Sequence, residues 1–189
     1  MMMDDIDRHL GDRIKTEREA RGWSLSILAE RSGVSRAMIN NIERGAASPT
    51  AALLGRLSGA FGLTLSTLLA RAEAGHAGRL VRAADQPRWR DPRTGYVRRQ
   101  VAPAIGSDLP LEVIEVELPP GAEIAYPAAA FAFIRQAVWV LKGRLTIQEA
   151  SSAHDLLEGD SLEFGPPTEI TFRNGTPDAC RYVVVLLKC

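Results

Sequence analysis

One short segment carries the side chains best suited to hydrogen-bond another molecule. Val34, Ile39 and Ile42 are spaced to form the buried face of a helix, which leaves the polar residues between them on its outer face. An Asn amide can form two hydrogen bonds with adenine in the major groove of DNA, and an Arg guanidinium can do so with guanine. The sequence therefore predicts a base-reading face made of Ser35, Arg36, Ala37, Asn40 and Asn41.

Other polar residues near the ends of these helices are suited to bind DNA phosphates. Backbone amides and hydroxyl groups at helix N-termini, and basic side chains nearby, are common phosphate ligands. We expect phosphate contacts from Ser24, Ser35, Arg44 and Ser48. An alternative fits the same apolar spacing: the helices could form a bundle that only dimerises, and Arg36 and Asn41 would then be solvated surface residues.

Five short helices are predicted within residues 5–70, because apolar residues recur there every three or four positions. N-terminal caps are expected at Ser24, Ser35, Thr50 and Thr64, and C-terminal stops at Gly22, Gly45 and Gly62. The second and third helices are separated by a short turn in which Gly33 can adopt left-handed backbone. The small Ala29 lets these two helices cross closely.

This order of helices resembles the phage-repressor (Cro/C1, or XRE) type of helix-turn-helix domain. The resemblance covers residues 12–70 and includes the stretch IERGAASPT after the third helix. It implies a five-helix, lambda-repressor-like fold whose third helix enters the major groove of double-stranded DNA. Leu25 stands where this family often has a Gln that contacts DNA. Because residues 1–70 carry nine basic and eight acidic side chains, one copy should bind DNA weakly, and a homodimer is expected.

The character of the chain changes after residue 70. Residues 71–78 are small and polar and predict a linker, and the apolar period then falls from about 3.6 to 2 over residues 79–189. Short β-type runs separated by Gly- and Pro-containing turns are typical of an all-β sandwich or barrel. The runs cover residues 113–118, 137–141, 144–148, 161–164, 169–173 and 181–187.

Residues 80–188 resemble the cupin superfamily, in particular the small barrel that bacterial regulators often carry after a helix-turn-helix domain. The likeness is carried by ELPPGAEIAYPA, QAVWVLKGRLTI and LLEGDSLEFGPPTEITFRNGTPDACRYVVVLL. It implies a multidomain α plus β chain that ends in an RmlC-like double-stranded β-helix, or jelly-roll barrel. In cupin enzymes, three His and one Glu from two motifs hold a divalent metal.

The metal-ligand positions of the two cupin motifs are filled by other residue types. Pro127 and Ala129 stand at the first two His positions, Gln136 at the Glu position and Ile170 at the last His position. Pro, Ala and Ile side chains have no donor atom, and an amide is a poor ligand beside His or carboxylate. The histidines of the chain fall in the first helix, the linker and a predicted turn: His9, His76 and His154. We therefore expect no metal, no cofactor and no catalytic residue.

The interior of such a barrel is predicted to hold a small, largely apolar effector that a few polar groups orient. Gln136 or Arg135 would read a carbonyl or carboxylate group of this molecule. The expected lining residues are Tyr126, Phe131, Phe133, Arg135, Gln136, Val138, Ile170 and Phe172. A packed core without a ligand is the alternative. Trp139 and Leu141, on the opposite face of their strand, would lie either in a core between sheets or in a dimer interface.

Charge is unevenly distributed along a chain whose formal net charge is zero. Residues 101–189 carry six basic and twelve acidic side chains, and an arginine-rich stretch precedes them. These arginines would lie near DNA or pair with the acidic residues of later strands: Arg79, Arg82, Arg88, Arg90, Arg93, Arg98 and Arg99. No segment has the apolar core of a signal peptide or the length of a membrane span, so a cytoplasmic protein without membrane contact is expected.

Together these features predict a dimeric, sequence-specific DNA-binding regulator of transcription whose cupin domain dimerises and senses a small molecule. Two other classes stay open. One is a cupin enzyme with an accessory helical domain, as in metal-dependent phosphonate epoxidases of this architecture, and the residue types at the ligand positions argue against it. The other is an antitoxin-like repressor that binds a partner protein.

Overall fold

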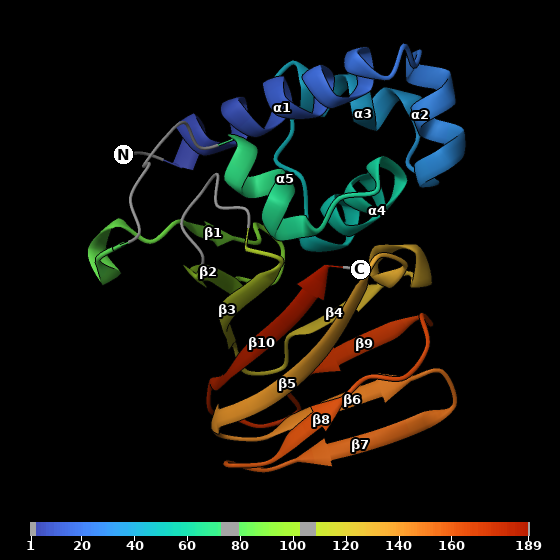
Figure 1. Ribbon diagram of the computed structural model, residues 1–189. Helices are drawn as coiled ribbons and strands as arrows, with labels where there is room; N and C mark the ends of the chain where they lie inside the picture. Colours follow the sequence, from blue (N-terminus) through green and yellow to red (C-terminus); the bar gives the residue numbers. More distant parts are fainter. Residues whose placement is uncertain (1–2, 73–79, 103–108, 189) are drawn as a thin grey trace.

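Five α-helices form the N-terminal unit of the computed structural model, which describes residues 3–72, 80–102 and 109–188 (Figure 1). The helices are α1 (Met3–Ala20), α2 (Leu25–Ser32), α3 (Arg36–Glu43), α4 (Ala51–Phe61) and α5 (Leu65–Ala72). The predicted caps are confirmed, because the side chains of Ser24, Ser35, Thr50 and Thr64 accept hydrogen bonds from the first turns of α2 to α5. Gly33, between α2 and α3, has a φ of +66°, the left-handed conformation that a tight turn requires.

The predicted linker is described only at its start. Residues 71 and 72 belong to α5, and residues 73–78 lie outside the described residues. The chain is described again from Leu80, and a short helix η1 (Ala83–Asp85) leads into the β unit. None of the described helices is long and apolar enough to cross a membrane.

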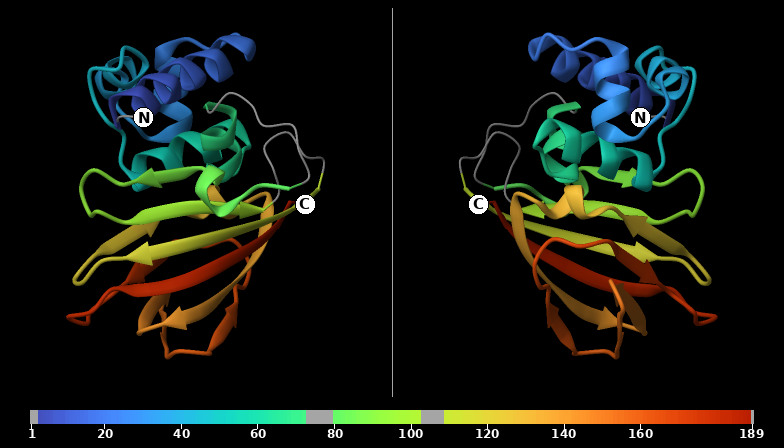
Figure 2. Two further views of the ribbon diagram at one scale, coloured as in Figure 1. Left: turned by 90° about the vertical axis from the view of Figure 1, so that its left-hand side faces the viewer. Right: turned by 90° about the vertical axis from the view of Figure 1, so that its right-hand side faces the viewer.

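Two antiparallel sheets face each other in the β unit, as the predicted jelly-roll barrel requires (Figure 2). The larger sheet has the order β1-β2-β3-β10-β5-β8, and the smaller has the order β4-β9-β6-β7. The strands are β1 (Arg88–Arg90), β2 (Val97–Ala102), β3 (Leu111–Leu118), β4 (Glu123–Tyr126), β5 (Ile134–Lys142), β6 (Leu145–Glu149), β7 (Ser152–Leu156), β8 (Ser161–Glu163), β9 (Ile170–Arg173) and β10 (Cys180–Lys188). A short helix η2 (Ala128–Phe131) joins β4 to β5.

Four strands, β1, β2, β4 and β7, lie where the apolar alternation of the sequence predicts none. The turn predicted around His154 is wrong, since His154 lies in β7 and pairs with Ile147 of β6. Leu156 is the buried residue of β7, so the segment has no alternation from which the strand could be read. β1 is three residues long, with Trp89 buried between two exposed arginines.

The central strands of the larger sheet build the core by alternation. Val184 of β10 is paired with Ile114 of β3 on one side and with Val138 of β5 on the other, and all three are buried inside the barrel. The preceding residue of β10, Val183, lies on the outer face beside Trp139. One face of each strand therefore fills the barrel, and the other forms its outer surface.

The helix α4 lies directly against the barrel, over η2 and β4 (Figure 1). Two glycines on one face of α4 allow this approach. A methyl group on Gly55 would lie 2.6 Å from Cδ1 of Tyr126, and one on Gly59 would lie 2.9 Å from the carbonyl oxygen of Ala129. The helical unit and the barrel consequently share one continuous hydrophobic core.

Gly55→Ala should destabilise the protein even though alanine favours helices by up to about 1 kcal/mol over glycine. The added methyl group would overlap the Tyr126 ring, and overpacking of this kind costs about 1–3 kcal/mol. We expect a lower midpoint of urea unfolding measured by circular dichroism. Gly175→Ala is the control, because a methyl group there meets nothing closer than 3.9 Å. Equal stability of the two variants would contradict the tight docking of α4.

Candidate functional site

The predicted base-reading residues are gathered on one accessible face of α3. Arg36, Ala37 and Asn41 are exposed there and Asn40 is half-buried, while Ile39 and Ile42 of α3 are buried beneath them. α2 and α3 lie in the part of the helical unit that is remote from the barrel (Figure 1). A helix presented in this way, with a second helix packed across it, has the geometry that enters a major groove.

The residues predicted to meet phosphates flank this face. The hydroxyl oxygens of Ser24 and Ser35 each accept a hydrogen bond over 3.2 Å from a backbone amide in the first turn of the helix that they cap. Arg44 and Ser48 are exposed just after α3. Leu25, at the position where the XRE type often has Gln, is half-buried and packs against the core. In this chain the side chain at position 25 therefore packs within the helical unit.

An ion pair fixes α3 to α1. Arg18 donates from Nε and Nη2 to the two carboxylate oxygens of Glu43, each over 2.7 Å, and from Nη1 to the backbone oxygen of Trp23 over 3.0 Å. The hydrogen bonds to Glu43 raise the pKa of Arg18 against the opposing effect of burial. Glu43 therefore positions α3, the helix predicted to read bases, and its place in the sequence does not reveal this because Arg18 lies 25 residues away.

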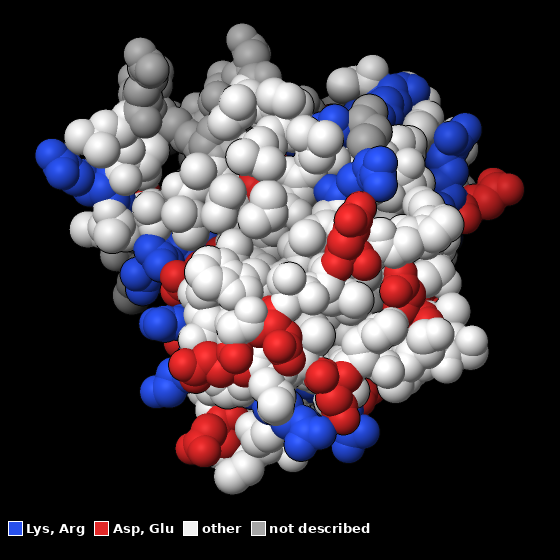
Figure 3. All heavy atoms as spheres, turned by 60° about the horizontal axis from the view of Figure 1, so that its bottom comes forward, with Lys and Arg blue, Asp and Glu red and all other residues white. Residues whose placement is uncertain are grey.

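Acidic side chains are spread over the end of the β unit that faces away from the helices, with Lys and Arg side chains among them (Figure 3). The chain beyond residue 100 carries twelve acidic and six basic side chains. Because acidic side chains are in excess in this part of the chain, the helical end of the molecule is the better suited of the two to a polyanion.

The arginine-rich stretch is divided between different environments. Arg99 pairs with Glu115 over 2.6 Å, so the predicted pairing with a later strand is confirmed for this residue. Arg98 turns inward instead, and its Nη2 donates to the hydroxyl of Ser66 in α5. The exposed members are Arg82, Arg88, Arg90 and Arg93, and Arg79 lies outside the described residues.

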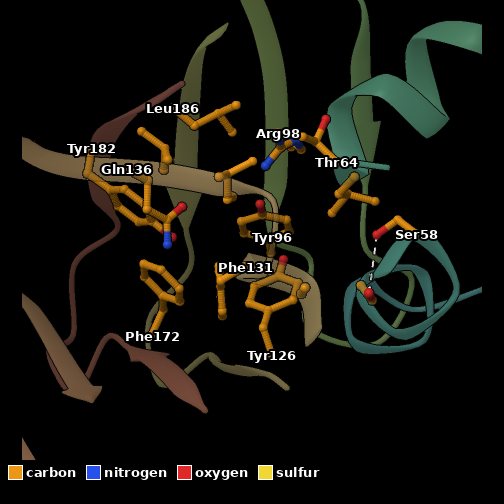
Figure 4. Close-up of a pocket in the computed structure, with 15 residues that line it drawn as sticks. Ser58, Thr64, Tyr96, Arg98, Tyr126, Phe131, Gln136, Phe172, Tyr182 and Leu186 are labelled. Atoms are coloured by element: carbon orange, nitrogen blue, oxygen red, sulfur yellow. Dashed lines mark hydrogen bonds between the residues drawn. The ribbon is translucent and has the colours of Figure 1, made fainter. Parts of the chain in front are cut away.

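A cavity lies between the barrel and the helical unit (Figure 4). Its free volume is about 50 Å³. The helical unit contributes Gly55, Ser58, Thr64 and Leu65 to its walls. The barrel contributes aromatic rings, among them Phe172 and Tyr182, which are stacked with 5.9 Å between their centroids. A molecule bound here would touch both units.

The effector-pocket residues predicted from the sequence are only partly brought together. Those that border the cavity are Tyr126, Phe131, Gln136 and Phe172. Arg135 and Ile170 border an outer cleft of about 320 Å³ that also touches Gln136. Val138 is buried in the core away from the cavity. The placement expected for Phe133 needs correction: its side chain is 46% exposed, because the turn after η2 directs it onto the C-terminal end of α4.

Two buried polar atoms beside the cavity do not meet the geometry of a hydrogen bond with any described residue: Nε2 of Gln136, and the hydroxyl of Tyr126, whose polar neighbour is the hydroxyl of Tyr96. Burial raises the pKa of Tyr126 well above its usual value, so its hydroxyl keeps its proton. Buried polar groups are seldom left unpaired, since each costs about 1–3 kcal/mol. The cavity therefore offers two hydrogen-bond donors to a polar molecule.

A buried carboxylate joins the barrel to the start of α5. Thr64 and Thr67 donate from their hydroxyl groups to Oε1 of Glu112, each over 3.1 Å, and Lys188 pairs with the same oxygen over 2.8 Å. Burial by itself would raise the pKa of Glu112. The hydrogen bonds from Lys188 and Ser66 and the positive charges of Lys188 and Arg98 outweigh burial and lower this pKa below its usual value. Glu112 is therefore ionised where it holds the two units together.

The cupin metal-ligand positions do not fit a metal centre in this chain. Pro127 and Ala129 lie at η2, Gln136 lies in β5 and Ile170 in β9, and three of these four side chains have no donor atom. Within residues 3–72, 80–102 and 109–188, no group of three or more His, Cys, Asp or Glu side chains is placed to hold a metal ion.

Residues 14–68 match the HTH_3 family, described as helix-turn-helix. The helical unit is an HTH_3 domain. It is similar to that of the HTH-type transcriptional regulator SutR of Escherichia coli (strain K12), with 43% identity over 67 residues, and to that of SinR of Bacillus subtilis (strain 168), with 38% identity over 61 residues. These matches cover 35% and 32% of this chain. The chain spans 38% of the length of SutR and 55% of the length of SinR.

The combination of an HTH_3 domain with this barrel is also found in a solved structure. An HTH_3 family transcriptional regulator from Vibrio cholerae superposes with a TM-score of 0.79 and 22% identity, covering 98% of this chain and 99% of that one. This likeness confirms the predicted fold, five helices followed by a barrel of two antiparallel sheets.

Acid should weaken the contact between the HTH_3 domain and the barrel through Glu112. Its folded-state pKa lies below the usual value of 4.5, so its stabilisation is complete above that pH and is lost as the pH falls through the folded-state pKa. Glu112→Gln should flatten the fall of the unfolding free energy between about pH 5 and pH 3, measured by urea titration at each pH. The exposed Glu117→Gln, on the same strand, should keep the wild-type profile. An unchanged profile for Glu112→Gln would refute this role.

Proposed function

We propose that this protein is a sequence-specific DNA-binding regulator of transcription. The observation that carries the proposal is the outer face of α3, where Arg36, Asn40 and Asn41 are held on a short helix that is capped at its start and tied to α1 near its end. Side chains of these types pair with guanine and adenine edges in the major groove. SutR and SinR, which share the HTH_3 domain, are both named transcriptional regulators, and this supports the proposal.

The barrel is proposed to sense a small molecule. An enzymatic role for a cupin barrel depends on a metal, and the side chains at the ligand positions of this chain are not of the types that bind one. Its cavity instead borders the HTH_3 domain, where a bound molecule could favour one arrangement of the two units over another. As a regulator of transcription, the protein is proposed to act in the cytoplasm, where it would meet its DNA.

A homodimer is proposed to form through the outer face of the larger sheet. Trp139 is 52% exposed on this face, and strand register places it beside Val183. Ala137, Val185 and Val113 form the neighbouring apolar row across β5, β10 and β3. The same patch on a second copy would be self-complementary about a two-fold axis. Two HTH_3 domains related in this way would meet two half-sites on DNA.

Arg36→Ala and Asn41→Ala should each weaken binding to a specific site by about 5-fold or more, because a bidentate base contact contributes about 1–3 kcal/mol of discrimination. Binding is measured by fluorescence anisotropy on a duplex selected from random sequences and on a scrambled duplex. Arg144→Ala, which removes an equal charge from the barrel, should bind like the wild type. Wild-type affinity of both α3 variants for the selected duplex would show that α3 is not the reading face.

Trp139→Glu should convert the dimer to a monomer, since it places a charge at the centre of the apolar face. The mass in solution is measured by light scattering after size-exclusion chromatography. Affinity for the selected duplex should fall at least about 10-fold, because two linked domains gain from joint binding. Leu157→Glu, at an apolar side chain of similar exposure outside this face, should remain dimeric. A dimeric Trp139→Glu variant would exclude this face as the interface.

A further inference from the structure

Arg98 is a buried cation without an ion-pair partner. It is 9% exposed and extends from β2 to the boundary between the barrel and the HTH_3 domain, where its Nη2 donates to the hydroxyl of Ser66. In the part of the chain that the structure describes, no carboxylate forms an ion pair with Arg98, and the neighbouring Glu112 is paired with Lys188 over 2.8 Å. Glu112 lies close enough for the charge of Arg98 to lower its pKa, but its ion pair is with Lys188. Two cations therefore share one carboxylate here, and this excess of positive charge favours a further anion.

Arg98 borders the same cavity as the two buried donors. Gln136 is 8% exposed, and neither its Nε2 nor the hydroxyl of Tyr126 meets the geometry of a hydrogen bond with a described residue. Figure 4 shows Arg98, Tyr126 and Gln136 extending from different strands of the barrel toward a common space. One cation and two neutral donors around one cavity form a set that suits a carboxylate better than a cation or a hydrocarbon.

The free volume of the cavity limits how many atoms a bound ligand can have. Its free volume is about 50 Å³, and a water molecule needs roughly 10–15 Å³ on the same measure. There is thus room for about three to five non-hydrogen atoms. Phe131 and Phe172 line the cavity with their rings, so one end of the ligand meets an apolar surface.

From this charge, donor set and size, we propose that the cavity binds a monocarboxylate of roughly two or three carbon atoms. Arg98 holds the carboxylate, Tyr126 and Gln136 donate to the oxygen atoms that Arg98 leaves open, and the aromatic rings cover the alkyl group. The outer cleft lies next to the cavity and shares Phe131, Ile134 and Gln136 with it.

Ligand binding in this cavity is also coupled to DNA binding by the HTH_3 domain, and that part of the inference rests on the proposed function. Ser58, Thr64 and Leu65 of the HTH_3 domain complete the walls of the cavity, so the ligand contacts both units only when they are docked. Filling the cavity must then favour the docked arrangement. By linkage, DNA affinity and carboxylate affinity change each other by the same factor.

The test uses full-length protein with propionate as the probe and propionamide as its neutral counterpart of equal size, at constant ionic strength. Propionate should raise the Tm by about 3–5 °C near saturation, with binding confirmed by calorimetry, whereas propionamide should not. Arg98→Gln should lower the propionate affinity at least about 10-fold. Arg99→Gln is the matched control, because Arg99 is the next residue of β2, has the same charge and pairs with Glu115 outside the cavity.

Gln136→Met keeps the cation and should weaken propionate binding several-fold, so the proposal can be tested even if Arg98→Gln does not fold. Equal effects of propionate and propionamide, or wild-type affinity in Arg98→Gln, would overturn the carboxylate site.

For coupling, propionate should change wild-type affinity for the selected duplex at least about 5-fold. An unchanged affinity with propionate bound would overturn the coupling. If the wild-type protein without propionate bound no DNA sequence specifically, the proposed function would be overturned, but the result for propionate binding would still hold.

Discussion

The two glycines of α4 set the distance between the HTH_3 domain and the barrel, and the other contacts between the units depend on that distance. With no side chain at Gly55 and Gly59, α4 can lie against the ring of Tyr126 and the backbone of Ala129. At a greater separation the cavity would lose the wall formed by Ser58, and Thr64 could not reach Glu112. One close helix contact therefore makes the two units a single packed structure.

The barrel also fixes the direction of two helices by placing a carboxylate at the start of each. Asp91 accepts a hydrogen bond over 2.5 Å from the backbone amide of Ala51, the first residue of α4. Glu112 accepts from Thr64 and Thr67 at the start of α5. Negative charge at a helix N-terminus is favoured by the unpaired amides and the helix dipole there. The HTH_3 domain is thus held by two helix ends and one helix face, which restricts both its tilt and its rotation on the barrel.

Features that depend on neighbours in the sequence could be predicted, and those that depend on distant partners could not. The caps at Ser24, Ser35 and Thr50 and the turn at Gly33 follow from local residue types, and the structure confirms them. The contact of Gly55 with Tyr126 joins residues 71 positions apart, and the residues next to each of them in the sequence give no indication of it. Strands β1 and β7 were missed because a short edge strand with one buried residue has no alternation to detect.

The positions that hold the metal ligands in cupin enzymes have a different location and role in this structure. Pro127 and Ala129, at the first two ligand positions, frame the start of η2, which is the segment that α4 contacts. Gln136, at the third, carries an unpartnered amide beside the cavity between the units. In a metal-binding cupin these positions point inward to a reaction centre. Here they lie where the barrel meets the HTH_3 domain, so positions that hold a metal in other cupins contribute instead to the contact between the two units.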